Sequence, residues 1–419
     1  MLLEASNRIG GRVYTVKDEF AGQTETVERG AQWVHGEGST FTLAKSFGEG
    51  LLEDDPFLDM MESNTDFGTS SGKGVTSPAL LKTYLELFKT LREGPSEEDS
   101  SDISFGNWFL KKIKAKELPQ DVHVTAFIHW LERLQTSIDA ADSWYESSVR
   151  GQLVYANCPG CPTILWTQGY QTLINIILNE SPTANDLPTW IKLNSQVTQI
   201  DYSNNPIITK TKDGTIFEAD AVIVAVSLGV LKSDHGKLFQ PPLPPVKVRT
   251  IEIWWDPNWV GLNLLWVEED SMEFPKWATN MLGFYTSKTC PHTLTGWITG
   301  EMAREIESID NKEIEGMIHK ILRRFMKNDK IPQPKVTVTK WFTDPLFRGS
   351  YSFRSVQSEE QDVWAKDLAE PITLENDTMV CFAGEATHSS FYSTVHGAHD
   401  TGIREANRLI RFFTSKPLP

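Results

Sequence analysis

Apolar residues recur every three to four positions in several segments, a spacing that is typical of amphipathic helices. The clearest stripe lies between residues 78 and 93, where Leu80, Leu81, Tyr84, Leu85, Phe88 and Leu91 share one side. We predict helices at residues 41–47, 78–93, 103–113, 122–138, 169–179, 301–326 and 393–413. Residues 78–145 therefore form a helical insert between two parts that are rich in strands.

Alternating or continuous apolar runs predict the strands. They are expected at residues 1–5, 13–16, 24–28, 191–200, 207–212, 215–226, 262–267, 282–285, 294–299, 334–341 and 380–383. Asp213 and Gly214 form a hairpin turn between two of them, and residues 54–74 read as a polar loop. Strands and helices mixed in this order predict an α/β lobe that is interleaved in sequence with an α+β lobe.

The length of 419 residues suggests two or three domains or one two-lobed enzyme. The formal charge, 40 − 56 = −16, disfavours a basic face for nucleic acid, whereas an acidic surface could steer a cationic ligand. No apolar run reaches the roughly 18 residues of a membrane span, and the first residues lack the apolar core of a signal peptide. With 4 cysteines in all, we expect a cytoplasmic monomer without nucleic-acid or membrane partners.

Three motifs carry candidate chemistry. In the first, Glu4 ends a strand and is followed by Gly10, Gly11 and Arg12. An acidic residue at such a strand end can accept hydrogen bonds from a ribose, paired glycines let the backbone approach a phosphate, and arginine can neutralise it. Taken alone, the motif fits a surface turn equally well.

The second motif, Gly30-Ala-Gln-Trp33-Val-His35-Gly36, sets small residues beside two rings and suits a flat ligand packed against backbone. A buried tryptophan beside a hydrogen-bonded histidine is the plain structural alternative. The third motif runs from Gly384-Glu385-Ala-Thr-His388 into a helix that begins at Ser393-Thr394. The first amides of that helix could face an acceptor such as a flavin carbonyl or a phosphate. The same pattern is also typical of a capped helix that packs against a sheet without a ligand.

Together and in this order, the three motifs resemble those of the flavin-containing amine oxidase family. The resemblance spans nearly the whole chain, because residues 225–232 match a strand and turn of that family and residues 341–351 match its substrate segment. His35 in Trp-Val-His-Gly is similar to the polyamine oxidase branch, to which the spermine and N1-acetylpolyamine oxidases of animals belong. The resemblance implies a Rossmann-like FAD-binding domain at residues 1–60, 150–240 and 375–419. It implies a mixed-sheet and helical substrate domain at residues 61–149 and 241–374.

The resemblance also implies the residues of the site. FAD would contact Glu4, Gly11, Arg12, Trp33, Val197, Glu385, Thr394 and Val395. Glu4 and Arg12 would hold adenosine ribose and phosphate, and the Val197 backbone would meet the adenine. Trp33 would pack near the flavin ring, Glu385 would hold the ribityl–phosphate region, and Thr394 and Val395 would offer backbone N–H groups to the pyrimidine end. Ser350 stands where monoamine oxidases carry the cysteine that attaches flavin, so the FAD is expected to be non-covalent.

His35, Tyr351 and Trp341 are the implied catalytic residues on the substrate side. Tyr351 and Trp341 would form an aromatic wall that attracts a cationic amine by roughly 0.5–2 kcal/mol, and His35 would hydrogen-bond the polyamine or a nearby water. The implied reaction oxidises a polyamine to an aldehyde and a shorter amine, and dioxygen becomes hydrogen peroxide.

Three departures from the family stand out. The strand and Gly-x-Gly-x-x-Gly loop that the family places before Glu4 are absent, so we expect the first βα unit to be missing. The strand that bears the family's flavin lysine has no room after Lys247, and no residue is assigned to it. A substrate-facing glutamate of the family falls loosely at Gln135. The alternative is therefore a non-catalytic or fragmentary family member, and a weaker one is the histone-demethylase branch, whose tower is not seen here.

Cys158-Pro-Gly-Cys161 stands outside these motifs. We interpret it as a structural loop, and a redox or metal role stays open, since the flanking strand–helix context and a second cysteine pair are not evident. His388, His396 and His399 gather near the end of the chain without a carboxylate that completes a metal site.

Overall fold

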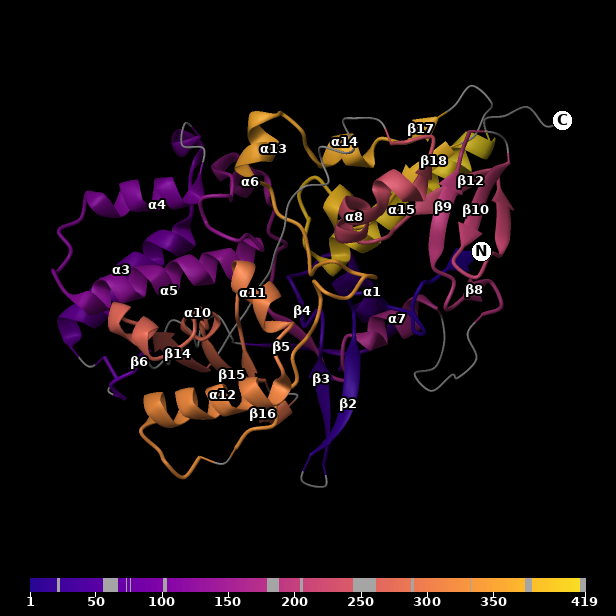
Figure 1. Ribbon diagram of the computed structural model, residues 1–419. Helices are drawn as coiled ribbons and strands as arrows, with labels where there is room; N and C mark the ends of the chain where they lie inside the picture. Colours follow the sequence, from indigo (N-terminus) through magenta and orange to yellow (C-terminus); the bar gives the residue numbers. More distant parts are fainter. Residues whose placement is uncertain are drawn as a thin grey trace.

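The computed structural model describes residues 1–20, 23–55, 67–72, 74–75, 77–100, 104–178, 188–203, 206–243, 261–287, 290–331, 333–373 and 379–414. Helices and a four-stranded sheet form one side of the molecule, and a group of sheets with both chain ends forms the other (Figure 1). Within the described residues, no helix is long and apolar enough to cross a membrane. The mixed α/β architecture agrees with the predicted fold class.

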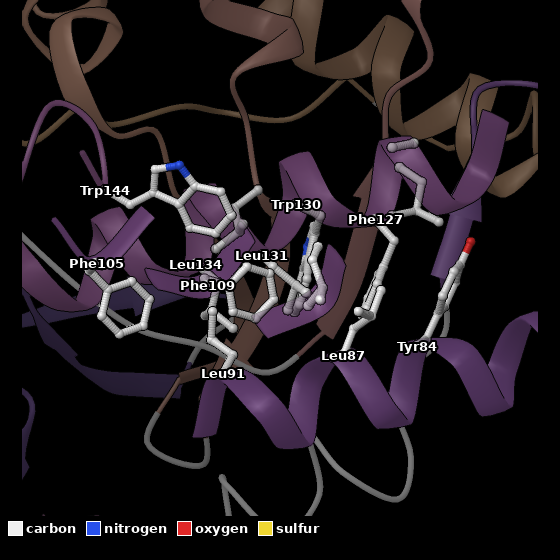
Figure 2. Packing of buried hydrophobic residues seen from close by; sticks show 14 of the residues in the cluster. Tyr84, Leu87, Leu91, Phe105, Phe109, Phe127, Trp130, Leu131, Leu134 and Trp144 are labelled. Atoms are coloured by element: carbon white, nitrogen blue, oxygen red, sulfur yellow. The ribbon is translucent and has the colours of Figure 1, made fainter. Parts of the chain in front are cut away.

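The helical insert consists of α3 (Pro78–Glu93), α4 (Phe105–Lys114) and α5 (Val122–Asp139), close to the predicted bounds. Their shared core is aromatic: the ring of Phe127 stacks on Tyr84 at 4.0 Å and on Trp130 at 5.5 Å (Figure 2). The predicted apolar stripe of α3 is wider than the face that packs. Leu81 and Leu85 are exposed, and the buried face runs instead through Tyr84, Leu87 and Leu91.

A four-stranded sheet in the order β16-β15-β14-β6 joins the insert to the helix α12. In β14, Leu265 belongs to the core of the helical insert, whereas Leu264 belongs to the core that α12 forms. Successive side chains of a strand point to opposite faces, so the sheet is buried on both sides. The strands and the helix are β6 (Phe67–Thr69), β14 (Gly261–Leu265), β15 (Gly283–Ser287), β16 (Cys290–Gly296) and α12 (Asn311–Met326).

Two predictions in this region are wrong. Residues 301–326 form two helices, α11 (Gly300–Ile306) and α12, because the Asp310 side chain accepts from Lys312 N and starts a new helix. Residues 333–340 form no strand with the described chain, although the predicted strand was 334–341. The Val336 amide donates to the side chain of Glu315 instead of to a neighbouring strand.

The other side of the molecule contains a parallel pair, β12 with β18, and an antiparallel set in the order β11-β10-β9-β13. The predicted hairpin at Asp213 and Gly214 is confirmed, and Gly214 has a φ of +87° there. The predicted single strand at 215–226 divides into β11 and β12, which join different sheets. Ile207, Val224 and Phe382 pack in one core between these sheets. The bounds are β9 (Val197–Asp201), β10 (Ile207–Thr211), β11 (Ile216–Ala219), β12 (Ala221–Val224), β13 (Phe239–Gln240) and β18 (Met379–Phe382).

Short elements connect the two sides. A hairpin of β2 and β3 projects from the body of the molecule (Figure 1), and the sheet β4-β7-β5 packs with α1 and α7 near its base. The bounds are β1 (Leu2–Leu3), β2 (Thr15–Phe20), β3 (Gln23–Glu28), β4 (Trp33–Val34), β5 (Leu52–Asp54), β7 (Ile164–Trp166), β8 (Ile191–Lys192), β17 (Ile372–Thr373), α1 (Ser39–Phe47), α6 (Val149–Val154), α7 (Gln171–Ile177), α8 (Leu228–Leu238), α10 (Lys276–Thr279), α13 (Val356–Glu360), α14 (Ala365–Ala369) and α15 (Val395–Thr414).

Candidate active site

A cavity of about 2460 Å³ reaches from the sheets near the chain ends to the helical insert. All eleven residues expected at the site from the sequence line this one cavity: Glu4, Gly11, Arg12, Trp33, His35, Val197, Trp341, Tyr351, Glu385, Thr394 and Val395. They come from both halves of the chain, so the fold brings the three motifs together as the sequence predicts.

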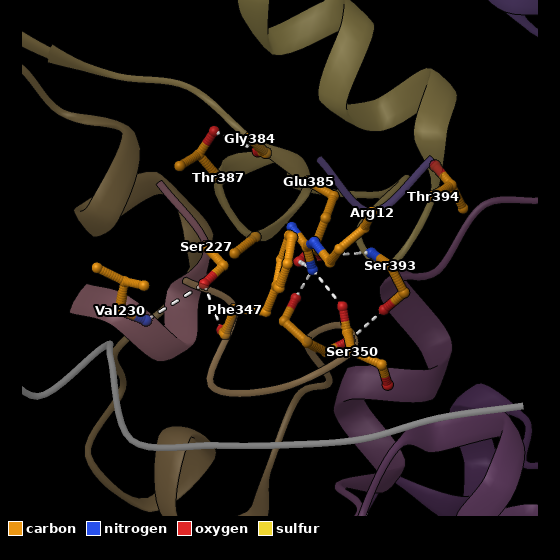
Figure 3. A network of polar contacts seen from close by, with 12 residues as sticks. Arg12, Ser227, Val230, Phe347, Ser350, Gly384, Glu385, Thr387, Ser393 and Thr394 are labelled. Atoms are coloured by element: carbon orange, nitrogen blue, oxygen red, sulfur yellow. Dashed lines mark hydrogen bonds and ion pairs between the residues drawn. The ribbon is translucent and has the colours of Figure 1, made fainter. Parts of the chain in front are cut away.

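Glu385 is the buried centre of a polar network on the wall of the cavity (Figure 3). Arg12 Nη1 donates to Glu385 Oε1 at 2.9 Å and also to the backbone oxygen of Ser350. The Ser352 hydroxyl and the Ser393 amide both donate to Glu385 Oε2 at 2.7 Å. Burial acts to raise the pKa of Glu385, but Arg12 and these donors outweigh it and hold its pKa below the ordinary value. The carboxylate is therefore ionised and fixed.

The helix α15 begins beside this network. Ser393 has a φ of +67° and turns the chain so that Thr394 and Val395, the first residues of the helix end, face the cavity. The Thr394 hydroxyl accepts from Gly397 N at 2.9 Å, as an N-terminal capping side chain does. Gly397 is required here, because a Cβ at this position would lie 1.9 Å from the Phe391 oxygen. The capped start of α15, with Thr394 and Val395, therefore lies on the cavity wall.

The Glu4–Arg12 segment also lines the cavity and reaches the Glu385 network through Arg12. Glu4 follows β1 and uses one oxygen, Oε1, to accept from Ser6 N at 2.7 Å. Gly10 and Gly11 have φ values of +106° and +59°, and a Cβ on Gly11 would meet no atom within 4 Å. No role for Arg8 is expected from the sequence. In the structure it shapes this turn, because its Nη2 donates to Gly11 O at 2.7 Å.

Two pairs of parallel strands lie beside the cavity. β1 pairs with β8 and β12 pairs with β18, and among the described strands neither has a second partner on its other edge. Residues of both β1 and β12 line the cavity. The βα unit that the sequence analysis expects to be missing relates to these open strand edges. The expected absence of the lysine strand falls on residues 247–255, which lie outside the described residues.

Trp33 and His35 form part of the middle of the cavity. The Trp33 indole is buried and donates to Asp55 Oδ2 at 3.0 Å, which fixes the ring. His35 Nδ1 lies 3.0 Å from Pro162 O, and because a carbonyl only accepts, Nδ1 carries the proton. Burial lowers the pKa of His35, so its ring is neutral and Nε2 remains free to accept.

Aromatic side chains and one carboxylate line the other end. Trp341 lies edge-on to Phe347 with 4.8 Å between ring centres, and the Tyr351 hydroxyl points to Ser137 O at 3.5 Å. Asp139, at the end of α5, also lines the cavity. Sequence reasoning did not single it out.

Gln135 does not line the cavity, so the loose match to a substrate-facing glutamate is wrong in position. Gln135 Nε2 lies behind Asp139 and donates to its Oδ2 at 2.9 Å. Burial raises the pKa of Asp139, although its hydrogen bonds with Gln135, Ser147 and Gln152 act against the rise. Asp139 follows Gln135 by one helical turn on the same side of α5, and that spacing was the available signal.

Comparisons with known proteins bear on this site. The family model for flavin containing amine oxidoreductase matches residues 1–410. The chain belongs to this family. It is 27% identical to Probable polyamine oxidase 5 of Arabidopsis thaliana, over 98% of this chain and 93% of that protein. It is 29% identical to the peroxisomal N(1)-acetyl-spermine/spermidine oxidase of Homo sapiens, over 98% of this chain and 89% of that protein.

Solved structures agree on the fold. Putrescine oxidase bound to putrescine superimposes with a TM-score of 0.66 at 17% identity, over 97% of this chain and 92% of that chain. The protein is thus an oxidoreductase of the flavin amine oxidase family, whose cofactor is FAD. Its relatives support oxidation of polyamines in general.

The described residues fit the family's cofactor. The Ser350 hydroxyl oxygen is buried without a hydrogen-bond partner in the described chain, and Ser350 lines the cavity. The space beside Gly11 is open, and Glu4 Oε2 is not engaged by the Ser6 amide. The Ser350 hydroxyl and the Glu4 carboxylate are therefore available to hydrogen-bond FAD on the cavity wall. Among the described residues, no cluster of histidine, cysteine or carboxylate side chains could hold a metal ion.

Proposed function

We propose that this protein oxidises a polyamine, either spermine or an acetylated polyamine, to an aldehyde and a shorter amine. In balance, the amine, dioxygen and water give the aldehyde, the shorter amine and hydrogen peroxide. The observation that carries this proposal is the buried carboxylate of Asp139, which lines the same cavity as Trp341 and Tyr351. A monoamine would leave that carboxylate without a cation.

Asp139 is proposed to bind a distal nitrogen of the chain-like substrate. A buried carboxylate attracts an ammonium group strongly, because little water screens the pair. The aromatic faces of Trp341 and Tyr351 add attraction of roughly 0.5–2 kcal/mol for a cation that passes them. Together they favour a long cation with more than one nitrogen over a short one.

FAD is proposed to lie along Glu4, Gly11, Arg12, Trp33, Val197, Glu385, Thr394 and Val395. When bound, it supplies the two-electron acceptor for the C–H bond next to the amine nitrogen. Glu4 would accept from ribose hydroxyls, while Thr394 and Val395 would donate backbone N–H groups to the flavin ring. Because Arg12 is already bonded to Glu385, its role on this surface includes holding that carboxylate in place.

The remaining residues prepare the amine. A nitrogen must be neutral before the adjacent C–H bond is broken, and a cavity wall of apolar and aromatic side chains favours the neutral amine. The neutral ring of His35 is proposed to accept a hydrogen bond at Nε2 from the amine or from a water beside it. Tyr351 and Trp341 would position the chain of the substrate. Ser350 cannot form the thioether of a covalent flavin, so the FAD is proposed to be non-covalent.

The test begins with the purified chain and its visible absorbance. Flavin bands near equal stoichiometry, released into the supernatant on denaturation, support a non-covalent site. Peroxide release is then measured with spermine, N1-acetylspermine and a monoamine such as benzylamine. Turnover of a polyamine but not of benzylamine is expected. A colourless protein that binds spermine in calorimetry supports the alternative, a non-catalytic family member.

A further inference from the structure

The Cys158–Cys161 loop bends sharply between α6 and β7. Its central residues are Pro159 and Gly160, and Gly160 has a φ of +87°. Proline followed by a glycine of positive φ is the combination that a type II turn requires. Such a turn brings the α carbons of its first and last residues within about 7 Å, and disulfides span about 4.4–6.8 Å. A turn of this type would place Cys158 and Cys161 at a separation that a disulfide can bridge.

The two thiols have different neighbours. Cys158 Sγ lies 3.8 Å from His396 Nε2, whereas Cys161 Sγ lies 3.1 Å from Thr163 O. Both cysteines are half-buried, and Cys381 is fully buried. Cys158 therefore has a proton acceptor beside it, and Cys161 is the nearest second thiol in sequence.

This loop is flanked by residues of the active-site cavity, Asn157 and Pro162. Pro162 O holds His35 Nδ1 at 3.0 Å, and Pro159 O accepts from Glu37 N at 2.7 Å. The contact is close, because a Cβ on Gly36 would lie 2.8 Å from Cys158 Cβ. A covalent change in residues 158–161 would therefore alter the position or mobility of the loop that carries His35.

The roles that usually accompany a C-x-x-C sequence do not fit. A thioredoxin-like motif follows a strand and starts a helix, but here a helix precedes the turn and a strand follows it. A zinc site needs four ligands, and the described residues contain no cluster of even three suitable side chains. What remains is a local pair of thiols beside a histidine.

We propose that Cys158 and Cys161 are a peroxide-sensitive pair that forms a reversible disulfide. The disulfide would rigidify the loop that contacts His35. Cys158 sulfur attacks one oxygen of hydrogen peroxide as its proton passes to His396, which gives a sulfenic acid and water. The Cys161 sulfur then attacks the sulfenic sulfur and releases a second water. The two sulfurs lose two electrons in all, and one peroxide is reduced to two waters.

The surroundings make this reaction slow and selective. Burial, and then the charge of Asp400, raises the pKa of the Cys158 thiol, so little thiolate exists before His396 accepts the proton. Burial lowers the pKa of His396 to about 4, so its neutral ring is a weak base and proton transfer from Cys158 limits the rate. Without a permanent thiolate, the pair does not react with weak oxidants at the rate of a thioredoxin-type cysteine.

The experiment exposes the purified full chain to added hydrogen peroxide, blocks free thiols and analyses tryptic peptides by mass. Residues 151–192 contain no lysine or arginine before Lys192, so Cys158 and Cys161 share one peptide. Cys290 and Cys381 fall in other peptides. We expect the shared peptide to lose both thiols and the mass of two hydrogen atoms, and dithiothreitol to restore both.

Three variants make the result specific. Cys158→Ser and Cys161→Ser are each expected to abolish the cross-link, and His396→Asn is expected to slow it severalfold. The unfolding temperature should rise on oxidation of the wild type and not of either serine variant. Both thiols remaining free, a disulfide between two chains, or oxidation of one cysteine to sulfinic acid without a cross-link would each overturn the proposal. The reaction uses added peroxide, so its outcome is independent of whether the chain oxidises a polyamine.

Discussion

Gln152 on α6 donates to Asp139 at the end of α5, with 2.6 Å between Nε2 and Oδ1. With Gln135 on the other oxygen, the carboxylate is held from two helices at once. Neither amide carries charge, so the pair orients Asp139 without neutralising it. The site keeps a negative charge available for a cationic substrate.

Asp139→Asn removes that charge with little change in shape. We expect kcat/KM for spermine to fall about tenfold to hundredfold, in line with one lost charge-assisted hydrogen bond of about 1.5–3 kcal/mol. Asp329→Asn is the control, because Asp329 pairs with Arg323 and neither residue lines the cavity. Steady-state peroxide release checks both variants. An equal loss in both would mean that Asp139 does not contact the substrate.

The pH profile gives a second test of Asp139. Burial raises the pKa of this carboxyl, so it takes up a proton at a higher pH than an exposed aspartate does. We therefore expect the acid limb of kcat/KM for spermine to begin above about pH 4, the ordinary range of aspartate. This limb should be missing in Asp139→Asn. An unchanged limb in the variant would assign it to another group.

Glu385→Gln breaks the ion pair with Arg12 while it retains the shape of the side chain. The Glu385 side chain is almost fully buried and that of Arg12 is partly exposed, so we expect a loss of about 1–3 kcal/mol of unfolding free energy at neutral pH. The folded-state pKa of Glu385 is depressed, so its contribution is present above the unfolded value of about 4.3 and is lost as the pH falls through the folded value. Denaturant unfolding of both proteins should therefore converge in acid. A constant difference at all pH values would contradict the ion-pair account.

Two glycines of α15 form a matched pair. A Cβ at Gly397 would lie 1.9 Å from the Phe391 oxygen, whereas a Cβ at Gly402 would meet no atom within 4 Å. We expect Gly397→Ala to destabilise the protein by about 2 kcal/mol or more, because backbone must move. Gly402→Ala should stabilise it by up to about 1 kcal/mol through helix propensity. Thermal unfolding without added cofactor measures both, and shifts of the same sign would contradict the steric account.

His396 predicts how stability responds to acid. Burial lowers its pKa to about 4, with further effects of His35, Asp400 and His388. Below about pH 6.5 the unfolded chain therefore binds this proton first, and stability falls as the pH falls from 6.5 towards 4. We expect His396→Asn to lose about 1–3 kcal/mol less than the wild type over this interval. Parallel pH curves for the two proteins would show that another group controls acid unfolding.

The sequence predicted what local signals control. α3 has the predicted bounds because Pro78 starts it and Gly94, with a φ of +66°, ends it. The Asp213–Gly214 hairpin is equally local, since Asp213 caps its own turn through Thr215 N. The three motifs could be recognised because each is contiguous in sequence, and the fold brings them to one cavity.

The failures come from contacts between distant segments. The break between α11 and α12 lies at Glu307, whose side chain accepts from Phe342 N and Thr343 N. Apolar periodicity continues through that break, and along the chain only the capping residue Asp310 marks it. Asp139 was missed for the same reason, because its place at the cavity depends on Gln152 in another helix. In both cases the position of one residue depends on a contact with a segment that is distant in sequence.

The bond between Arg12 and Glu385 joins positions that are 373 residues apart. During synthesis Arg12 leaves the ribosome long before Glu385 is made, so the pair must be among the last contacts to form. The cavity wall that both residues build is completed at the same moment. Flavin bound along this wall, as proposed, would therefore report on the finished chain alone, and its colour would serve as a measure of correct assembly in variants remote from the proposed FAD surface.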